Sequence, residues 1–238
     1  MSVRRDADLR RTAVGVALVL AAPLSVVSWV LVPVSMVEGM EFVDGILSTS
    51  RGVMVTSLVT GVVFFPLAVI GIMGLMHLLK GKPSVVGTLG GGMAIAGLTL
   101  NTVALGAAGT LAEVALSDVA PSQSAALVEA TMRGPTGILM LFGPLIAAIG
   151  TTMLASRLFV ARTIPRLYAV SLAIYGPLQV VGFATEIIAI ITASYAVMML
   201  AFTPVGLLLI TGTGRDWENP PTFQGWLGTR RVSEAVAT

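Results

Sequence analysis

The chain has no cysteine and a single histidine, His77, among its 238 residues. Without cysteine there is no disulfide framework, no thiolate metal site and no cysteine nucleophile. One histidine excludes a histidine-rich metal site and argues against a histidine-dependent triad. The sequence also lacks a G-x-S-x-G motif and a calcium-loop spacing. We therefore expect no metal and no other cofactor.

Charge is also scarce. Charged residues make up 11% of the chain and hydrophobic residues 55%, and the mean hydropathy is +0.94. Because a soluble domain carries about 25% charged residues, this chain has too little polar surface for a water-facing globule. A soluble enzyme is excluded. No segment between the apolar blocks is long enough for a nucleic-acid-binding domain, so we expect no nucleic-acid partner.

Long apolar runs are what the sequence has instead. A bilayer core of about 30 Å takes about 20 residues of helix, and the last run, Leu167–Thr211, is too long for one helix. The cluster at 192–194 is the preferred turn within it, and Thr185-Glu186 is the alternative. The prediction is an all-α polytopic bundle with six spans, at about 12–34, 53–79, 84–111, 134–160, 167–191 and 195–211.

The basic residues predict the orientation of these spans. Cytoplasmic loops carry the excess of Lys and Arg. With a cytoplasmic N-terminus, every Lys and Arg except Arg51 and Arg133 falls on the cytoplasmic side. Residues 1–211 are then one transmembrane domain with both termini cytoplasmic, and 212–238 are a cytoplasmic tail. The first apolar block is too long for a signal-peptide core, so we expect it to be retained.

The loop before the fifth span carries a resemblance. The stretch 156–167 reads Ser-Arg-Leu-Phe-Val-Ala-Arg-Thr-Ile-Pro-Arg-Leu, and an apolar span with glycine follows it. In this hairpin and in its overall topology, the chain resembles a group of uncharacterised bacterial six-span integral membrane proteins. That resemblance implies a multi-pass protein of the bacterial inner membrane. It brings no established activity and therefore no site residues.

Polar residues at membrane depth are the candidate ligand-binding residues, because such groups are costly in lipid unless they have a partner. On a helical wheel Tyr175, Gln179, Gly182 and Glu186 share one face of the fifth span. Glu186 is either a proton- or cation-binding carboxylate or an interfacial residue paired with Arg133. Besides Tyr175, Gln179 and Glu186, the candidates include Asn101 in the third span. Its amide either binds a ligand or forms a hydrogen bond that holds two helices together.

Other residues have expected structural roles. The third span is rich in glycine and alanine, which predicts a central helix with several packed neighbours. Prolines in five of the spans predict kinks that could open a cavity. We expect His77, Trp217 and Trp226 at the headgroups, and the tail could instead dock to a partner. The outer loops carry acids that could attract cations or simply be solvated, namely Glu38, Glu41, Asp44, Glu113, Asp118 and Glu129.

Three functions fit these features. The first is a protein that binds or transports a small solute or ion, with a small molecule or cation as its ligand. The second is a membrane-embedded enzyme that acts on an isoprenoid or lipid through an intramembrane carboxylic acid; it needs an aromatic-lined pocket around that acid. The third is an accessory subunit that packs on a membrane-protein partner or on copies of itself.

Overall fold

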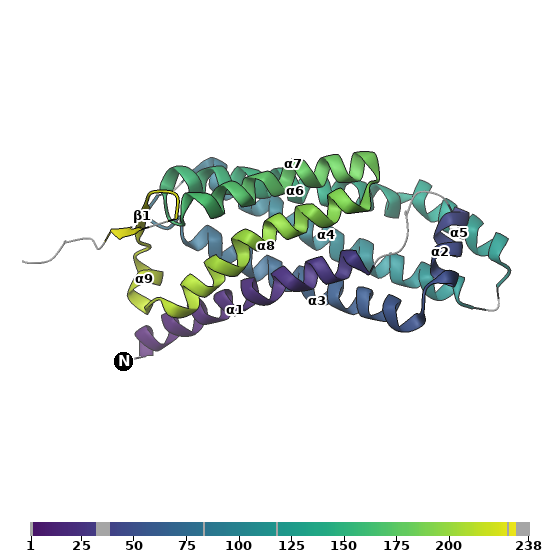
Figure 1. Cartoon of the computed structure of the whole chain (residues 1–238), viewed down its shortest axis with the longest axis horizontal. Coiled ribbons are helices and arrows are strands. Elements are labelled where there is room, and N and C mark those ends of the chain that lie inside the picture. Colours follow the sequence, from purple (N-terminus) through teal and green to yellow (C-terminus); the bar gives the residue numbers. More distant parts are fainter. Residues whose placement is uncertain (1, 32–38, 83, 118, 228, 232–238) are drawn as a thin grey trace, which may run out of the picture.

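The structure is a computed structural model that describes residues 2–31, 39–82, 84–117, 119–227 and 229–231. It is the predicted all-α bundle (Figure 1), and six of the described helices are long and apolar enough to cross a membrane. These are α1 (Ser2–Val30), α3 (Arg51–His77), α4 (Val85–Ala115), α6 (Pro135–Ala161), α7 (Arg166–Thr185) and α8 (Ile188–Thr211). The shorter elements are α2 (Gly39–Ser48), α5 (Pro121–Arg133), α9 (Gly214–Glu218), β1 (Thr222–Gln224) and β2 (Thr229–Arg231).

The six long helices form a closed ring. Each packs mainly against the long helices next to it in sequence, and α1 closes the ring against α8. The third span, α4, is therefore one member of the ring and does not lie at its centre. Its small residues pack it tightly against α6 and α3, and α2 and α5 also contact it, so the several packed neighbours that were expected are present. The interior of the ring is filled by large side chains from several helices, among them Leu18, Phe64, Ile72, Leu154, Leu172 and Phe202.

The two ends of the bundle differ. With a rise of about 1.5 Å per residue, the 31 residues of α4 extend about 46 Å, well beyond the apolar thickness of a bilayer. Helices α2 and α5 lie against this excess length (Figure 1), and we call this the cap end. A small apolar core holds it together, made of Phe42, Val43, Ile46, Met54, Leu111, Ala112, Ala115, Ala125 and Val128.

The opposite end, which we call the tail end, holds the start of α1 together with α9 and the β1–β2 hairpin (Figure 1). Both ends of the described chain therefore lie on the same side, as six spans require. Most basic residues lie there too, so the positive-inside rule predicts that the tail end is cytoplasmic. The basic residues of its loops and helix ends are Arg10, Arg11, Lys80, Lys82, Arg157, Arg162, Arg166 and Arg215.

The turn between the last two spans is not where it was expected. Helix α7 ends at Thr185, Glu186 adopts a left-handed conformation with φ of 58°, and α8 begins at Ile188. The alternative at Thr185-Glu186 is confirmed, and the preferred turn at 192–194 is wrong. Ser194 lies inside α8 and is fully buried, and its one hydroxyl hydrogen is shared between the carbonyl oxygen of Ile191 and Oε1 of Gln179. The predicted end of the first span at Val34 lies outside the described residues.

Glycines bring α4 and α6 into backbone contact. A Cβ atom on Gly97 would lie 2.3 Å from the backbone nitrogen of Ala147, and one on Gly150 would lie 2.3 Å from that of Ala94. Only glycine allows such an approach, which is how helices gain packing contacts in lipid. This α4–α6 seam fixes one side of the ring.

One proline inside a helix shows how the bundle compensates for a lost backbone hydrogen bond. Pro177 has no N–H to donate to the carbonyl oxygen of Ala173, one turn earlier in α7. The hydroxyl group of Thr152, in the neighbouring α6, donates to that oxygen instead, at 3.4 Å. Neighbouring helices commonly satisfy backbone groups freed in this way.

Candidate functional site

Gln179 is the centre of a buried hydrogen-bonded cluster between α7 and α8. Its Nε2 donates to the hydroxyl oxygen of Tyr195 at 3.1 Å, and its Oε1 accepts a hydrogen bond from Ser194. Only 1% of Gln179 is exposed. Both ends of the amide are therefore satisfied, so it clasps two helices together. Tyr175, one turn earlier in α7, is buried beside the ring of Tyr195, with the centroids 5.7 Å apart.

Aromatic rings surround Tyr195 on the other sides. The ring of Trp29 stacks on it with the centroids 5.8 Å apart, and Phe64 meets it edge-on at 5.7 Å. Phe183 contacts Trp29 edge-on at 5.7 Å. Helices α1, α3, α7 and α8 each contribute to this cluster, and such ring pairs are favourable beyond the area they bury. The cluster forms one wall of a cavity.

That cavity, which we call the central cavity, has a volume of about 90 Å³ and lies inside the helix ring. All six long helices contribute to its lining, and most of the lining is apolar or aromatic. None of its lining residues carries a charge. They are Ser28, Trp29, Gly61, Phe64, Phe65, Asn101, Ala104, Leu105, Ala108, Met140, Pro144, Phe183 and Tyr195.

Hydrogen-bonding groups gather where α4 and α6 meet the central cavity. Asn101 is 8% exposed, and a Cβ atom on Gly143 would lie 2.5 Å from its Oδ1. The neighbouring Pro144 has no N–H to donate to the carbonyl oxygen of Met140, and both residues line the cavity. The glycine makes room for the amide, and the proline frees a carbonyl acceptor close to it. A small ligand could donate to or accept from this side of the cavity.

Glu186 lies apart from the other three predicted residues. The helical wheel placed Glu186 on the same face of the fifth span as Gln179. In the structure α7 ends at Thr185, and the side chain of Glu186 is exposed in the turn that follows. Its interpretation as a proton- or cation-binding carboxylate stays a prediction, and its exposed position separates it from Gln179. Arg133, its expected partner, instead pairs with Glu129. Among the described residues, no three His, Asp or Glu side chains are grouped so that they could hold a metal ion.

The structure therefore brings Tyr175 and Gln179 together, places Asn101 in the cavity beside them, and separates Glu186. Sequence reasoning missed Tyr195 and Ser194, because it placed the turn at 192–194. With the turn at 186–187, residues equally far from it on the two antiparallel helices face one another, and Gln179 and Ser194 are such a pair. The sequence did hold a signal for this pair. Choosing the charged residue Glu186 as the turn, and not the polar cluster at 192–194, would have revealed it.

The tail folds back onto the bundle. Trp217 stacks on His77 with the ring centroids 4.2 Å apart, and its carbonyl oxygen lies 3.0 Å from Nε2 of that histidine. Only 4% of Trp217 is exposed, so its ring packs against the bundle, and its expected position near the headgroups stays a prediction. Lys80 pairs with Glu218 at 2.8 Å, and the backbone N–H of Phe223 donates to the carbonyl oxygen of Arg162.

The position of Glu218 makes one of these tail contacts dependent on pH. The hydrogen bond from Lys80, together with its positive charge, lowers the pKa of the exposed Glu218 carboxyl group below its ordinary value of 4.5. The tail contact is therefore formed at neutral pH.

No protein-family model, curated protein or solved structure matches this chain.

Proposed function

We propose that this membrane protein binds a small uncharged solute in the central cavity, as a step in moving it across the bilayer. The observation that carries the proposal is the cavity itself. All six long helices line it, it has an amide and a freed carbonyl group on one side, and its lining has no charge. A cavity lined by every helix of the ring is where a solute would pass between the two sides of the membrane.

The lining favours an uncharged solute over an ion. A charge in so apolar a place is costly unless an opposite charge or water accompanies it. The volume of about 90 Å³ is smaller than the cavity of about 150 Å³ that holds benzene in an engineered protein. A solute of a few non-hydrogen atoms with at least one hydrogen-bonding group fits these limits. Asn101 would pair with that group, and Trp29 and Tyr195 would supply the apolar wall.

Passage beyond the cavity would require the ring to open toward the tail end. Helices α1 and α8 close that route, because a Cβ atom on Gly15 would lie 2.8 Å from the carbonyl oxygen of Gly206. Leu18 and Phe202, both buried, fill the interior on the same two helices. In this proposal α1 slides or rocks against α8 and so opens the cavity toward the tail end. Small shear motions between packed helices produce domain movements of this kind.

The test uses purified protein in liposomes, with acetamide and glycerol as probes and shrinkage followed by light scattering. We expect the wild-type protein to raise the permeability to at least one probe above that of empty liposomes. Asn101→Leu should lower that increment by about fivefold to tenfold, the worth of about one hydrogen bond. Thr99→Val is the matched control, because Thr99 lies on the same helix but is exposed and bonds its own backbone.

Both variants must melt at the wild-type temperature for the comparison to hold. Unchanged permeability in Asn101→Leu liposomes, or no flux of either probe above that of empty liposomes, would contradict the proposal. A larger flux of potassium than of acetamide would also contradict it, since the solute would then be an ion.

The enzyme alternative requires an aromatic-lined pocket and an acid inside it, and the cavity has only the aromatic lining. Trp29, Phe64 and Phe65 line the central cavity, which supplies aromatic faces for a cationic intermediate. An acid to protonate the substrate has no counterpart among the lining residues, and Glu186 is exposed in a turn. Solute binding is therefore the better-supported function.

A second candidate, packing against another membrane protein or a second copy, is favoured by one face of α4. Gly92, Thr99 and Gly106 recur every seven residues, are exposed, and the two glycines have open space where a Cβ atom would lie. Such a face allows a second helix to approach closely. Gly106→Leu should then convert an oligomer to a monomer in light scattering of the detergent-solubilised protein. A monomeric wild-type protein would contradict this candidate.

A further inference from the structure

A second and larger cavity lies at the tail end, separate from the central cavity. Its volume is about 210 Å³, and the tail covers it from one side through Trp217, Pro221 and Phe223. We call it the tail cavity. Helices α1, α3 and α8 and the turn between α6 and α7 complete its lining, with Arg11, Leu78, Thr163, Ile164, Val205, Leu208, Leu209, Thr211, Gly212 and Asp216.

Two polar groups in this lining have no partner. The side-chain Nε of Arg11 and the hydroxyl oxygen of Thr163 are buried and form no hydrogen bond with any described residue. Arg11 is 7% exposed and Thr163 is 2% exposed. Because a buried donor without an acceptor costs about 1–3 kcal/mol, such groups call for an explanation. Both can donate a hydrogen bond, so both would be satisfied by an oxygen atom of a ligand.

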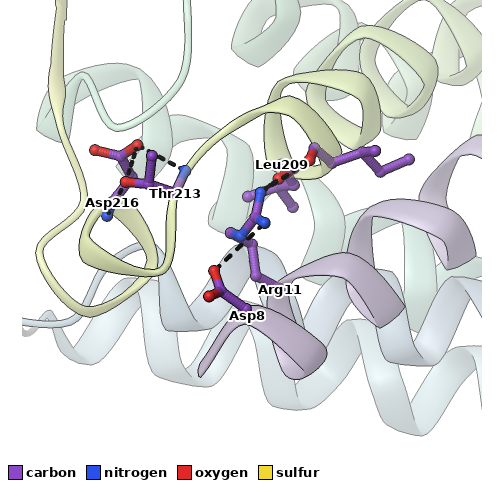
Figure 2. Close-up of polar contacts among 6 residues, drawn as sticks. Asp8, Arg11, Leu209, Thr213 and Asp216 are labelled. Atoms are coloured by element: carbon purple, nitrogen blue, oxygen red, sulfur yellow. Dashed lines mark hydrogen bonds and ion pairs between the residues drawn. The ribbon is translucent and has the colours of Figure 1, made fainter. Parts of the chain in front are cut away.

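The rest of Arg11 is already engaged, which defines what the cavity can accept. Figure 2 shows its guanidinium group reaching from α1 to the end of α8, where Nη1 donates to the carbonyl oxygens of Leu209 and Ile210. Its Nη2 lies 3.5 Å from a carboxylate oxygen of Asp8. The positive charge of Arg11 is therefore balanced, and Asp216 adds a negative charge to the same lining. This balance disfavours an anionic ligand and favours an uncharged acceptor oxygen.

The position of the tail cavity adds a second restriction. It lies at the last turn of α8, where the apolar sequence of the span ends, and two of its lining residues, Leu208 and Thr211, are exposed. Most of the lining is apolar, from Leu78, Ile164 and Val205. A ligand that enters here would carry an apolar body together with its oxygen acceptor. Carbonyl esters have this chemistry, both in glycerolipids, where they lie at this depth, and in small soluble esters.

We propose that the tail cavity binds an uncharged ester, whose carbonyl oxygen accepts hydrogen bonds from Thr163 and from Nε of Arg11. The apolar part of the ester packs against Leu78, Val205 and Trp217. The tail is the cover of this site: α9 is capped at Thr213 by Asp216 (Figure 2), which fixes the chain just before Trp217. This site uses no residue of the central cavity and does not depend on its function.

The experiment compares ester and ether lipids with the same headgroup and chains. Full-length protein is placed in nanodiscs of diacyl or dialkyl phosphatidylcholine, released in a mass spectrometer, and scored for one retained lipid. We expect the wild-type protein to retain the ester lipid about tenfold more than the ether lipid, which lacks the carbonyl acceptor. Thr163→Val should abolish this difference, and it should not unfold the protein because the hydroxyl group bonds nothing in the described structure.

Thr211→Val is the matched control. Thr211 lines the same cavity, but its hydroxyl group already donates to the carbonyl oxygen of Leu207, so this variant should keep the ester preference. Methyl hexanoate added in solution distinguishes the source of the ester. If it raises the melting temperature of the wild-type protein but not of the Thr163→Val protein, the ligand is a soluble ester. If only the diacyl lipid shows the difference, the ligand is a membrane lipid.

Both of these outcomes support carbonyl recognition in the tail cavity. Equal retention of ester and ether lipids with no response to methyl hexanoate would overturn the proposal. So would an ester preference that survives in Thr163→Val, because the donor would then lie elsewhere.

Discussion

At the scale of single residues, the hairpin of α7 and α8 buries a polar side chain whose hydrogen bonds are satisfied and exposes one that carries a charge. Gln179 and Glu186 share one face of an ideal helical wheel, yet one is fully buried between two helices and the other is exposed in a turn. The carboxylate avoids the cost of a buried charge by ending the helix. The amide is retained inside because Ser194 and Tyr195 satisfy both of its ends.

Replacing Gln179 by leucine should therefore destabilise the protein by about 1–2 kcal/mol, since Tyr195 and Ser194 each lose a partner in lipid. The free energy of unfolding is measured by unfolding the protein in mixed micelles with a denaturing detergent. Glu186→Gln, in the same hairpin, is the control and should change stability by less than about 0.5 kcal/mol. A larger loss from Glu186→Gln than from Gln179→Leu would contradict the assignment of the two side chains.

At the scale of helices, backbone contact between α4 and α6 holds one side of the ring. The two helices approach so closely that several glycines have backbone atoms of the partner helix where a Cβ atom would lie. The sequence showed that this span is rich in small residues, but not which of them face a neighbour. Gly97 faces α6, whereas Gly92 on the same helix faces outward into open space.

The same substitution at these two positions should therefore have opposite effects. Gly97→Ala places a Cβ atom 2.3 Å from the backbone nitrogen of Ala147 and should cost about 1–3 kcal/mol. Gly92→Ala meets nothing and should be neutral or stabilise the helix by up to about 1 kcal/mol. Thermal unfolding of the two purified variants makes the comparison. Equal melting temperatures would show that the α4–α6 seam is not packed as described.

The tail contacts give a prediction on pH. Because the pKa of Glu218 is lowered in the folded chain, its pairing with Lys80 contributes stability above the ordinary pKa of 4.5. This contribution is lost as the pH falls below that value and through the lowered pKa. Hydrogen exchange at residues 214–219 should therefore be faster in Glu218→Gln than in the wild-type protein at pH 7, and the difference should shrink as the pH falls through the lowered pKa. A difference that does not change with pH would rule out this ion pair as its cause.

At the scale of the whole molecule, the ring of six helices places both termini at the basic tail end and α2 and α5 at the opposite end. The even number of spans and the distribution of arginine and lysine agree on this arrangement. The closure of the ring between α1 and α8 then creates the central cavity, which no single helix could enclose.

The absence of native cysteine makes this topology directly testable. Single cysteines are introduced at Ser122 in α5 and at Asn219 in the tail, both of which are exposed. In intact cells a membrane-impermeant maleimide should label Ser122→Cys and leave Asn219→Cys unlabelled until the membrane is permeabilised. Labelling of Asn219→Cys in intact cells would reverse the orientation and with it the side from which each cavity is reached.

The sequence by itself predicted a multi-pass membrane protein with six helical spans and both termini on one side, and the cytoplasmic assignment of that side stays a prediction. These follow from local properties, because the bilayer requires about 20 apolar residues per span and basic loops stay inside. It also singled out Tyr175, Gln179, Asn101 and Glu186 as polar groups at membrane depth, of which the first three are buried and Glu186 is exposed. It could not determine which helix faces meet, since packing depends on residues far apart in the chain.

Only the tertiary structure decided the rest. The helix ring, the pairing of Gln179 with Tyr195, and the exposure of Glu186 depend on a turn whose position the apolar pattern did not fix. The tail is the clearest case: nothing in residues 212–231 alone indicates that Trp217 stacks on His77, because these contacts form only after the spans have brought their ends together. The bilayer specifies how each segment crosses it, and side-chain fit between segments specifies where the cavities lie.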